Sequence, residues 1–420
     1  MPILLRTAAE NAYYMRLCLS LLQLSMLCVQ LRLYLPALTF LEAALSLLRA
    51  TWSPSRTWAS GVRRVREWSF DAYSDAECWE RMRFRKEDFP VLLREFGLEN
   101  SGHADGLWRV RDKHGVVQCC FKPMELLVIF LARMASINTW SALQGWLGGK
   151  SVTAYKLAFA FVLDHIYGHF KHTVSDVNRW ARDARRFSIA IKEAGVSRKL
   201  RMPHASILAY ACYVPCAGAP ASMCIGFIDG TFRSCARPSV GQEYVYSGYY
   251  KSHGLKFQSV IAPNGMIIDF YGPVPGRRSD SYMLDKSGFE VRMRRLNRSL
   301  GMRRGDYHVY GDPAYALSRY IMRGFKGVMN PRQAAFSRAM NALRVSVEWG
   351  FMLVVRDWRY IDCEKHLKIM LQPIGKLYWV AAILTNVKSC VMAENHDGYG
   401  NLIAQRFRCS PPSLHEYLHG

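Results

Sequence analysis

The feature that most constrains this 420-residue chain is a series of short apolar runs, bounded by turn residues, in its second half. The runs predict four strands, at Met223–Ile228, 255–261, Met266–Tyr271 and Tyr307–Tyr310. Apolar side chains then repeat at helical spacing, which predicts one amphipathic helix over residues 333–356. Strands followed by mixed helices predict an α/β or α+β sheet with helical cover.

The preceding region has the start and stop signals of three helices joined by short turns. Pro123 fits a first helical position, and Thr139 and Ser151 fit N-caps of helices at Trp140–Leu147 and from Ser151 to about Gly168. Such a region is compatible with a helix-turn-helix DNA reader. An ordinary helical bundle that packs on the next domain is the other interpretation, and spacing alone leaves both open.

We expect five segments along the chain. They are a Leu-rich N-terminal helical segment (1–50), a basic linker (51–75), a helical region expected to bind DNA (76–200), the sheet domain (221–390) and a C-terminal tail (391–420). The uncharged run between Arg16 and Arg32 is too short for the roughly 20 residues that span a bilayer. A packing helix is therefore the main interpretation of that run, with membrane and secretory interpretations as the minority.

The chain carries 56 Lys and Arg against 33 Asp and Glu, a formal net charge of +23. A folded protein with this excess is expected to bind polyanions, nucleic acid first and anionic membrane second. Six arginines fall within 13 residues without an acid among them, and they suit phosphate contacts or, as the structural interpretation, a solvated surface loop. They are Arg292, Arg294, Arg295, Arg298, Arg303 and Arg304. Arg63, Arg64 and Arg66 suit a minor-groove arm or a nuclear import signal.

The twelve cysteines are scattered and predict reduced, mostly buried thiols in an intracellular protein. Cys212, Cys216 and Cys224 with His204 come nearest to a zinc pattern, but they lack the tight paired spacing of most zinc sites.

Three acids occupy positions that favour a metal site. Asp229 and Asp312 each follow a predicted strand, and Glu348 borders the apolar stripe of the predicted helix. Two carboxylate-bound ions can activate a nucleophile and stabilise a leaving oxygen in phosphodiester chemistry. Each acid also has a structural interpretation: a hairpin turn for Asp229, a helix N-cap for Asp312 and an ion pair with Arg344 for Glu348. Asp280 is a fourth candidate, or else a cap of a helix that starts near Ser281.

Six motifs in order resemble one family over roughly residues 75 to 418. They are IDGT at Ile228–Thr231, YSGYYKSHGLKFQSV at Tyr246–Val260, GPVPGRRSD at Gly272–Asp280, YGDPAY at Tyr310–Tyr315, LRVSVEWGF at Leu343–Phe351 and a C-terminal PPSLHEYL. Together they resemble the PIF/Harbinger class of DDE transposases and its domesticated nuclease relatives. The chain departs from the usual family pattern at Tyr249 and Ser279, where the family usually has His, and this bears on substrate positioning.

The resemblance implies a ribonuclease-H-like fold and a triad of Asp229, Asp312 and Glu348, with Asp280 as an accessory acid. It also implies Mg²⁺ or Mn²⁺, two ions, for nicking and joining DNA strands at transposon ends. Arg277 and Arg278 of the third motif join the arginine cluster as candidate DNA contacts. A nuclear location, a separate Myb-like DNA-binding partner and a homo-oligomer are further expectations. The alternative is a domesticated, catalytically silent DNA-binding or scaffold protein that keeps the fold.

Overall fold

The computed structural model describes residues 20, 23, 68–112, 114–197, 223–302 and 306–420. The chain divides into two units, Met1–Val65 and Arg66–Gly420, and in the first only Ser20 and Gln23 are described, both exposed and helical. Several predictions therefore lie outside the described residues. These are the Leu-rich helix, the Arg63–Arg64–Arg66 cluster, the zinc pattern with His204, Cys212 and Cys216, and Arg303 and Arg304 of the arginine cluster.

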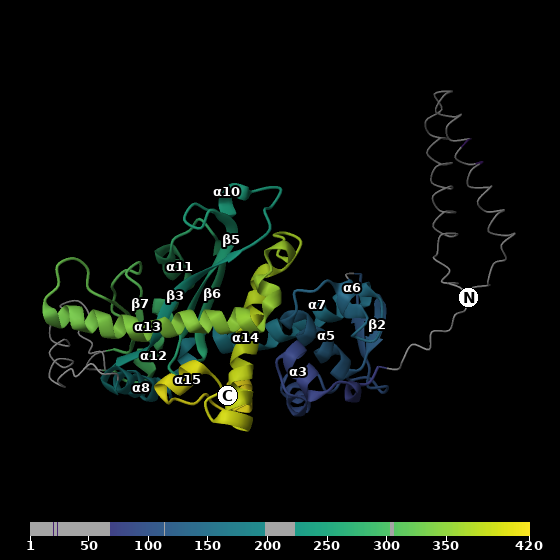
Figure 1. Ribbon diagram of the computed structural model, residues 1–420, viewed down its shortest axis with the longest axis horizontal. Coiled ribbons are helices and arrows are strands. Elements are labelled where there is room, and N and C mark those ends of the chain that lie inside the picture. Colours follow the sequence, from purple (N-terminus) through teal and green to yellow (C-terminus); the bar gives the residue numbers. More distant parts are fainter. Residues whose placement is uncertain (1–19, 21–22, 24–67, 113, 198–222, 303–305) are drawn as a thin grey trace. The chain divides into compact units, whose positions relative to one another are not determined.

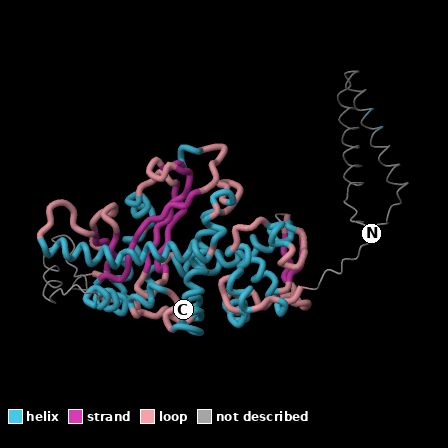
Figure 2. Tube along the Cα trace, in the orientation of Figure 1, coloured by secondary structure: helices cyan, strands magenta, loops and turns pink. Residues whose placement is uncertain are grey.

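The second unit contains a six-stranded mixed sheet (Figures 1 and 2). Its strands are β3 (Cys224–Ser234), β4 (Tyr246–Ser247), β5 (Ser252–Ile261), β6 (Ile267–Pro275), β7 (His308–Gly311) and β8 (Ile321–Arg323). β5 pairs antiparallel with β3, β4 and β6, whereas β7 pairs parallel with both β3 and β8. The sheet thus has three long antiparallel strands followed by two short parallel ones. The four predicted strands are all present, and the prediction of a mixed sheet with helical cover is confirmed.

Strand β3 is longer than the sequence predicts. It does not end in a hairpin at Asp229-Gly230 but runs on to Ser234, with Asp229 opposite Ser259 of β5. An Asp-Gly pair is a turn signal only when nothing else fixes the backbone, and here eight consecutive residues of β3 pair with β5. Asp229 consequently lies inside a strand, not at its end.

Helix α13 (Pro331–Asp357) runs across β3, β5 and β7 (Figure 1). Asn330 and Gln333 form a capping box at its start, and Pro331 takes the first helical position. Val347, Phe351 and Val354 are buried on one side of the helix, as the repeat predicts. The helix is three residues longer than the predicted range of 333–356, two at its start and one at its end.

The region before the sheet is mainly helical, with one hairpin. Its elements are α3 (Asp75–Met82), α4 (Phe89–Glu95), β1 (Trp108–Arg111), β2 (Val117–Phe121), α5 (Pro123–Ala135), α6 (Trp140–Gln144), α7 (Val152–Phe170) and α8 (Ala184–Ser197). The predicted signals are confirmed: Pro123 starts α5, and the side chains of Thr139 and Ser151 cap α6 and α7. α5 packs on α7, and α7 packs on the later helix α14 (Ile374–Met392). This packing is that of a bundle seated on the next domain, while DNA reading by the region stays a prediction.

The remaining helices complete the cover of the sheet and the C-terminal segment. They are α10 (Gln242–Val245), α11 (Asp280–Ser287), α12 (Phe289–Ser299), α15 (Leu402–Phe407) and α16 (Leu414–His419). Helix α14 is buried over most of its length and contacts β6, α7, α13 and α16. Within the described part of the chain, no helix combines the length and apolarity required to cross a bilayer.

The described cysteines are free thiols, and most of them are buried. Cys224, the described member of the weak zinc pattern, is fully buried in β3, where burial raises the pKa of its thiol to about 12. A thiol of that kind is a core side chain, because a zinc ligand has to be a thiolate.

Candidate functional site

Asp229 is held in the middle of β3, in a largely buried position. One oxygen of its carboxylate accepts a hydrogen bond from the Gly230 N–H at 2.9 Å. Burial raises the pKa of Asp229 to about 6, Arg344 opposes the rise, and the negative charges of Asp312 and Asp280 add to it. These electrostatic effects show that the other two aspartates lie close enough to interact with Asp229.

Arg344 of α13 bridges two of the three predicted triad acids. Its Nη1 lies 3.1 Å from Oδ2 of Asp229, and its Nη2 lies 3.2 Å from Oε1 of Glu348. The predicted pairing of Glu348 with Arg344 is therefore confirmed, but the arginine extends on to Asp229 as well. The guanidinium is only 17% exposed, whereas Glu348 is half exposed at 52%. A single cation thus sits against carboxylates that are 119 positions apart in the sequence.

Asp312 follows β7, but it does not cap a helix as the structural interpretation predicts. Its carboxylate accepts a hydrogen bond from the Ala314 N–H in a turn, and the chain continues as a loop to β8. A Pro at the first helical position therefore does not suffice to start a helix here. The fully buried Tyr315 packs beside this turn, and a β-carbon on Gly311 would lie 3.1 Å from Cδ2 of that ring.

The buried phenol of Tyr315 is a further group that senses the charge of these acids. Burial raises the pKa of its phenol, and the negative charges of Asp280, Asp229 and Asp312 raise it further. Asp280, Asp229 and Asp312 thus all lie within electrostatic range of Tyr315. Arg344 joins the fourth candidate acid, Glu348, to Asp229.

Asp280 is the first residue of α11, and Ser279 is the N-cap, so the predicted capping role of Asp280 is wrong. Its Oδ1 lies 3.0 Å from Nζ of Lys256 on β5. A β-carbon on Gly230 would lie 2.8 Å from that same Oδ1. Asp280 is thus packed directly on the strand that carries Asp229, and a lysine of the neighbouring strand pairs with it.

The acids fit a divalent-cation site in chemistry, because oxygen donors gather where their repulsion needs a cation. Arg344 shows that positive charge is favourable between Asp229 and Glu348. Among the described residues, two groups of three ligand residues have all their donor atoms within 4.8 Å of one another, and neither contains Asp229, Asp312 or Glu348. The triad oxygens are therefore farther apart than that, and Arg344 occupies part of the space between them.

An aromatic ladder stands beside the acids. Tyr250 stacks on Phe232 with ring centroids 4.3 Å apart and an angle of 8° between the planes. Tyr249 meets Tyr250 edge-on at 4.9 Å and is 87% exposed. The acids Asp280 and Asp229 raise the pKa of Tyr250 in addition to burial, which places the ladder next to the site. In the sequence, Tyr249 stands out only as a departure from the family pattern, and the stacking of these rings was not predicted.

The predicted arginine cluster separates into inward and outward side chains. Arg292 is not a surface group, because it forms a two-point ion pair with the buried Asp269 at 2.7 and 2.8 Å. Arg294, Arg295 and Arg298 lie exposed on α12, an amphipathic helix where the structural interpretation expects a loop. Arg277 and Arg278 are exposed too, each over a tyrosine ring, Tyr244 at 4.9 Å and Tyr282 at 4.5 Å.

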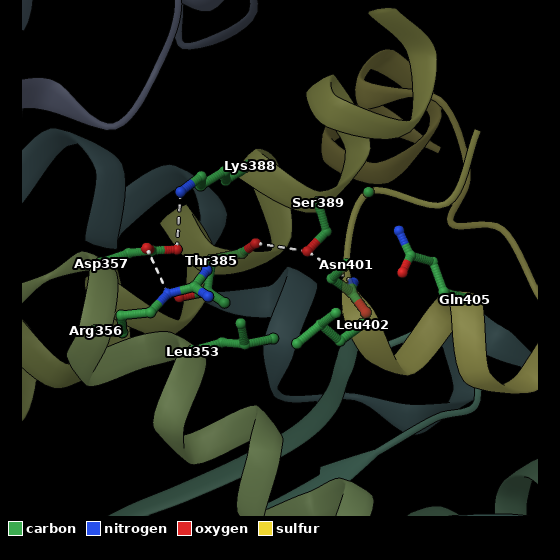
Figure 3. Close-up of a pocket in the computed structure, with 10 residues that line it drawn as sticks. Leu353, Arg356, Asp357, Thr385, Lys388, Ser389, Asn401, Leu402 and Gln405 are labelled. Atoms are coloured by element: carbon green, nitrogen blue, oxygen red, sulfur yellow. Dashed lines mark hydrogen bonds and ion pairs between the residues drawn. The ribbon is translucent and has the colours of Figure 1, made fainter. Parts of the chain in front are cut away.

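A separate cavity of about 150 Å³ lies between the end of α13, α14 and α15 (Figure 3). Its polar side chains bond to one another: Lys388 to Asp357 at 3.0 Å, and Asn401 to Ser389 at 3.0 Å. None of the four candidate acids lines it. The cavity therefore adds nothing to the candidate site.

The region that holds these acids also has a recognisable sequence signature. Residues 228–386 match the family described as DDE superfamily endonuclease. The matched residues include Asp229, Asp280, Asp312 and Glu348 as well as Lys256 and Arg344. No curated protein and no solved structure matches the chain significantly.

The DDE endonuclease match and the sheet together define the fold. The fold is a ribonuclease-H-like mixed sheet with helices, preceded by a helical region, and the segment similar to DDE endonucleases lies within it. This similarity supports an enzyme of the nuclease or transposase type in general. The sequence predicted the four acids as candidates. It did not predict that Lys256 pairs with Asp280, that Tyr315 lies near the acids, or that Arg344 contacts Asp229.

Proposed function

We propose that this protein is a metal-dependent DNA endonuclease and transposase of the PIF/Harbinger type, which nicks phosphodiester bonds and joins strands. The observation that carries the proposal is the convergence of Asp229 and Glu348 on one cationic group, with Asp312 and Asp280 close by. One strand, one loop and two helices supply these four acids. Such a gathering of carboxylates is costly unless cations neutralise their mutual repulsion.

Asp229, Asp312 and Glu348 would hold Mg²⁺ or Mn²⁺, two ions in our proposal. The chemistry that such ions supply is activation of water or a 3′ hydroxyl and stabilisation of the leaving oxygen. Lys256 holds the carboxylate of Asp280 against β3, so this acid is positioned by an ion pair at 3.0 Å. Arg344 orients Asp229 and Glu348 towards a common point. The packing of α13 on the sheet places Arg344 against Asp229, and Glu348 lies one helical turn further along.

The substrate we propose is double-stranded DNA at transposon ends, bound in the nucleus. The exposed arginines of α12 and of the loop before α11 supply phosphate contacts, and the aromatic ladder offers a ring face beside the acids. A separate Myb-like partner and a homo-oligomer are parts of the same proposal, and they rest on the family resemblance alone.

A second candidate function is a domesticated DNA-binding or scaffold protein without catalysis. The observation that favours it is that Arg344 already neutralises Asp229 and Glu348. An acid pair closed by an arginine needs no metal to be stable. This candidate shares DNA binding with the first and differs from it in strand cleavage.

Strand nicking of terminal-repeat DNA with Mg²⁺ or Mn²⁺ separates the two. We expect nicking by the wild type and loss of nicking in Asp229→Ala, Asp312→Ala and Glu348→Ala. Asp285→Ala is the matched control, because Asp285 is an exposed acid of α11 that pairs with its neighbour Lys286. Binding of the same DNA is measured in parallel by fluorescence anisotropy. Binding without nicking in the wild type would support the second candidate, and equal nicking by wild type and Asp229→Ala would refute the first.

A further inference from the structure

One cluster of potential metal ligands lies outside the segment that matches the endonuclease family. Glu95 lies at the end of α4 and contacts His415 and His419 of α16. The two helices are more than 300 positions apart in the sequence. The histidines belong to the C-terminal stretch that begins with PPSLHEYL, a motif for which the proposed catalytic function has no use. The two histidines are four residues apart, so they lie on one face of the helix.

The spacing of the donor atoms matches a tetrahedral metal. Oε2 of Glu95 lies 3.0 Å from Nδ1 of His415 and 3.3 Å from Nε2 of His419. Zinc–ligand bonds of about 2.0–2.1 Å at tetrahedral angles put neighbouring ligands about 3.3 Å apart. A zinc ion would therefore fit among these atoms with small rotations of the side chains.

The environment also suits a bound cation. The carboxylate of Glu95 is 9% exposed, whereas His415 is 76% exposed and faces solvent. A nearly buried carboxylate oxygen therefore meets two imidazoles on a side that is open to water.

The second cluster with similar spacing, Glu87, Asp88 and His396, is less suited. Both oxygens of Asp88 already accept hydrogen bonds, from the Arg85 N–H and from Nδ2 of Asn395, each at 2.9 Å. This second cluster also offers only one nitrogen ligand, that of His396. His396 therefore provides a matched control.

We propose that Glu95, His415 and His419 form a Zn²⁺ site, with water as the fourth ligand, that fastens helix α16 to helix α4. Two imidazole nitrogens and a carboxylate oxygen are a common zinc set with one open position. The rest of α16 is already in place, because Tyr417 bonds to Thr173 at 2.8 Å and to Asn386 at 3.0 Å. Metal binding would thus add a link to a site that packing has prepared.

The test uses the metal-free full-length protein and Zn²⁺ alone, without DNA. We expect calorimetry to show zinc binding and a rise in melting temperature. Co²⁺ should give the intense visible absorption of a tetrahedral site with nitrogen and oxygen ligands. His415→Ala and His419→Ala should each weaken zinc binding by more than about 10²-fold, since even the loss of an outer-shell partner costs 10–100-fold.

His396→Ala and Asp229→Ala are the controls, and both should keep the zinc-dependent rise in melting temperature. Circular dichroism without metal checks that each variant folds; the high exposure of His415 makes its replacement mild. The same zinc response in wild type and His415→Ala, or no zinc response at all, would overturn the proposal. The contacts of the two histidines with Glu95 would then be hydrogen bonds that hold α16 on α4 without a metal.

Discussion

At Gly230 the structure leaves no room for a β-carbon. Such an atom would lie 2.8 Å from Oδ1 of Asp280 and 3.0 Å from Cε of Met283. The smallest residue is therefore what allows Asp280 to rest on the strand next to Asp229. The position of Asp280 beside Asp229 therefore depends on Gly230 as well as on the acids themselves.

We expect Gly230→Ala to destabilise the fold by about 1–3 kcal/mol, the usual cost of overpacking, and to lower strand nicking more than DNA binding. The added methyl group would push Asp280 away from β3 and from Lys256. Urea unfolding and the nicking assay measure the two effects. Gly168→Ala is the control, because nothing lies within 4 Å of the corresponding position in α7. Unchanged nicking in Gly230→Ala would exclude a role for the placement of Asp280.

His308 makes the stability of the sheet sensitive to acid. It is fully buried in β7, and burial lowers the pKa of its imidazole from 6.5 to about 4. The unfolded chain binds the proton first as pH falls, so stability is full above pH 6.5 and is lost between pH 6.5 and 4. A difference of this size corresponds to about 3 kcal/mol at 1.36 kcal/mol per pKa unit.

We therefore expect the free energy of unfolding of the wild type to fall over this range, and that of His308→Leu to fall less. Urea unfolding at a series of pH values measures the slope. His103→Leu, at an exposed position, is the control. Parallel pH profiles for wild type and His308→Leu would contradict the assignment.

Apolar patterns marked Asp229, Asp312 and Glu348 as candidate acids, and the ordered family motifs, not the patterns, selected them as a set. Their surroundings were not predictable from the sequence. Lys256 reaches Asp280 through the pairing of β5 with β3 and β6, and Arg344 reaches Asp229 across 115 positions of sequence. Contacts of this kind depend on tertiary register, which local periodicity does not contain.

The contact of α13 with the sheet is the element-scale feature on which the site depends, since this helix carries both Arg344 and Glu348. It comes closest at Gly350, where a β-carbon would overlap Cδ1 of Ile261 on β5. Ile261 is fully buried and has no free space to move into. The helix lies close to the strands only because this position is a glycine.

We expect Gly350→Ala to cost about 1–3 kcal/mol of stability despite the better helix propensity of alanine, and to reduce nicking. Ile261→Val removes the overlapping Cδ1 and should cost about 0.5–1.5 kcal/mol by itself. In the double variant the two costs should not add, because the valine leaves room for the new methyl group. Additive free energies in this cycle would show that the two residues do not compete for space.

The helices were better predicted than the strand ends. Caps and prolines at Pro123, Thr139 and Ser151 act within one turn, so the sequence nearby contains what decides each helix start. The continuation of β3 past Asp229 was missed, because a partner strand 30 residues later determines it. The loop after Asp312 was missed because the local sequence resembles an N-cap followed by Pro, although no helix follows it.

At the scale of the whole molecule, the net charge of +23 makes any DNA complex strongly dependent on salt. Removing Arg294, Arg295 and Arg298 together should lower the slope of log K against log salt by up to about 2.7, at about 0.9 for each phosphate contact. Anisotropy titrations over a range of salt measure the slope. The control removes three exposed cations elsewhere: Arg359, Lys365 and Lys368. Equal slopes in both triple variants would mean that α12 acts only through net charge.

Helix α14 has a consequence for how this protein can change over evolution. Its side chains are shared, because the helix packs on β6 and α13 of the sheet domain and also on α7 of the preceding helical region. A fragment that began at β3 would leave the apolar residues that face α7 open to water, and such a fragment would aggregate. We therefore expect the sheet domain and the preceding helical region to be gained or lost together when genes recombine.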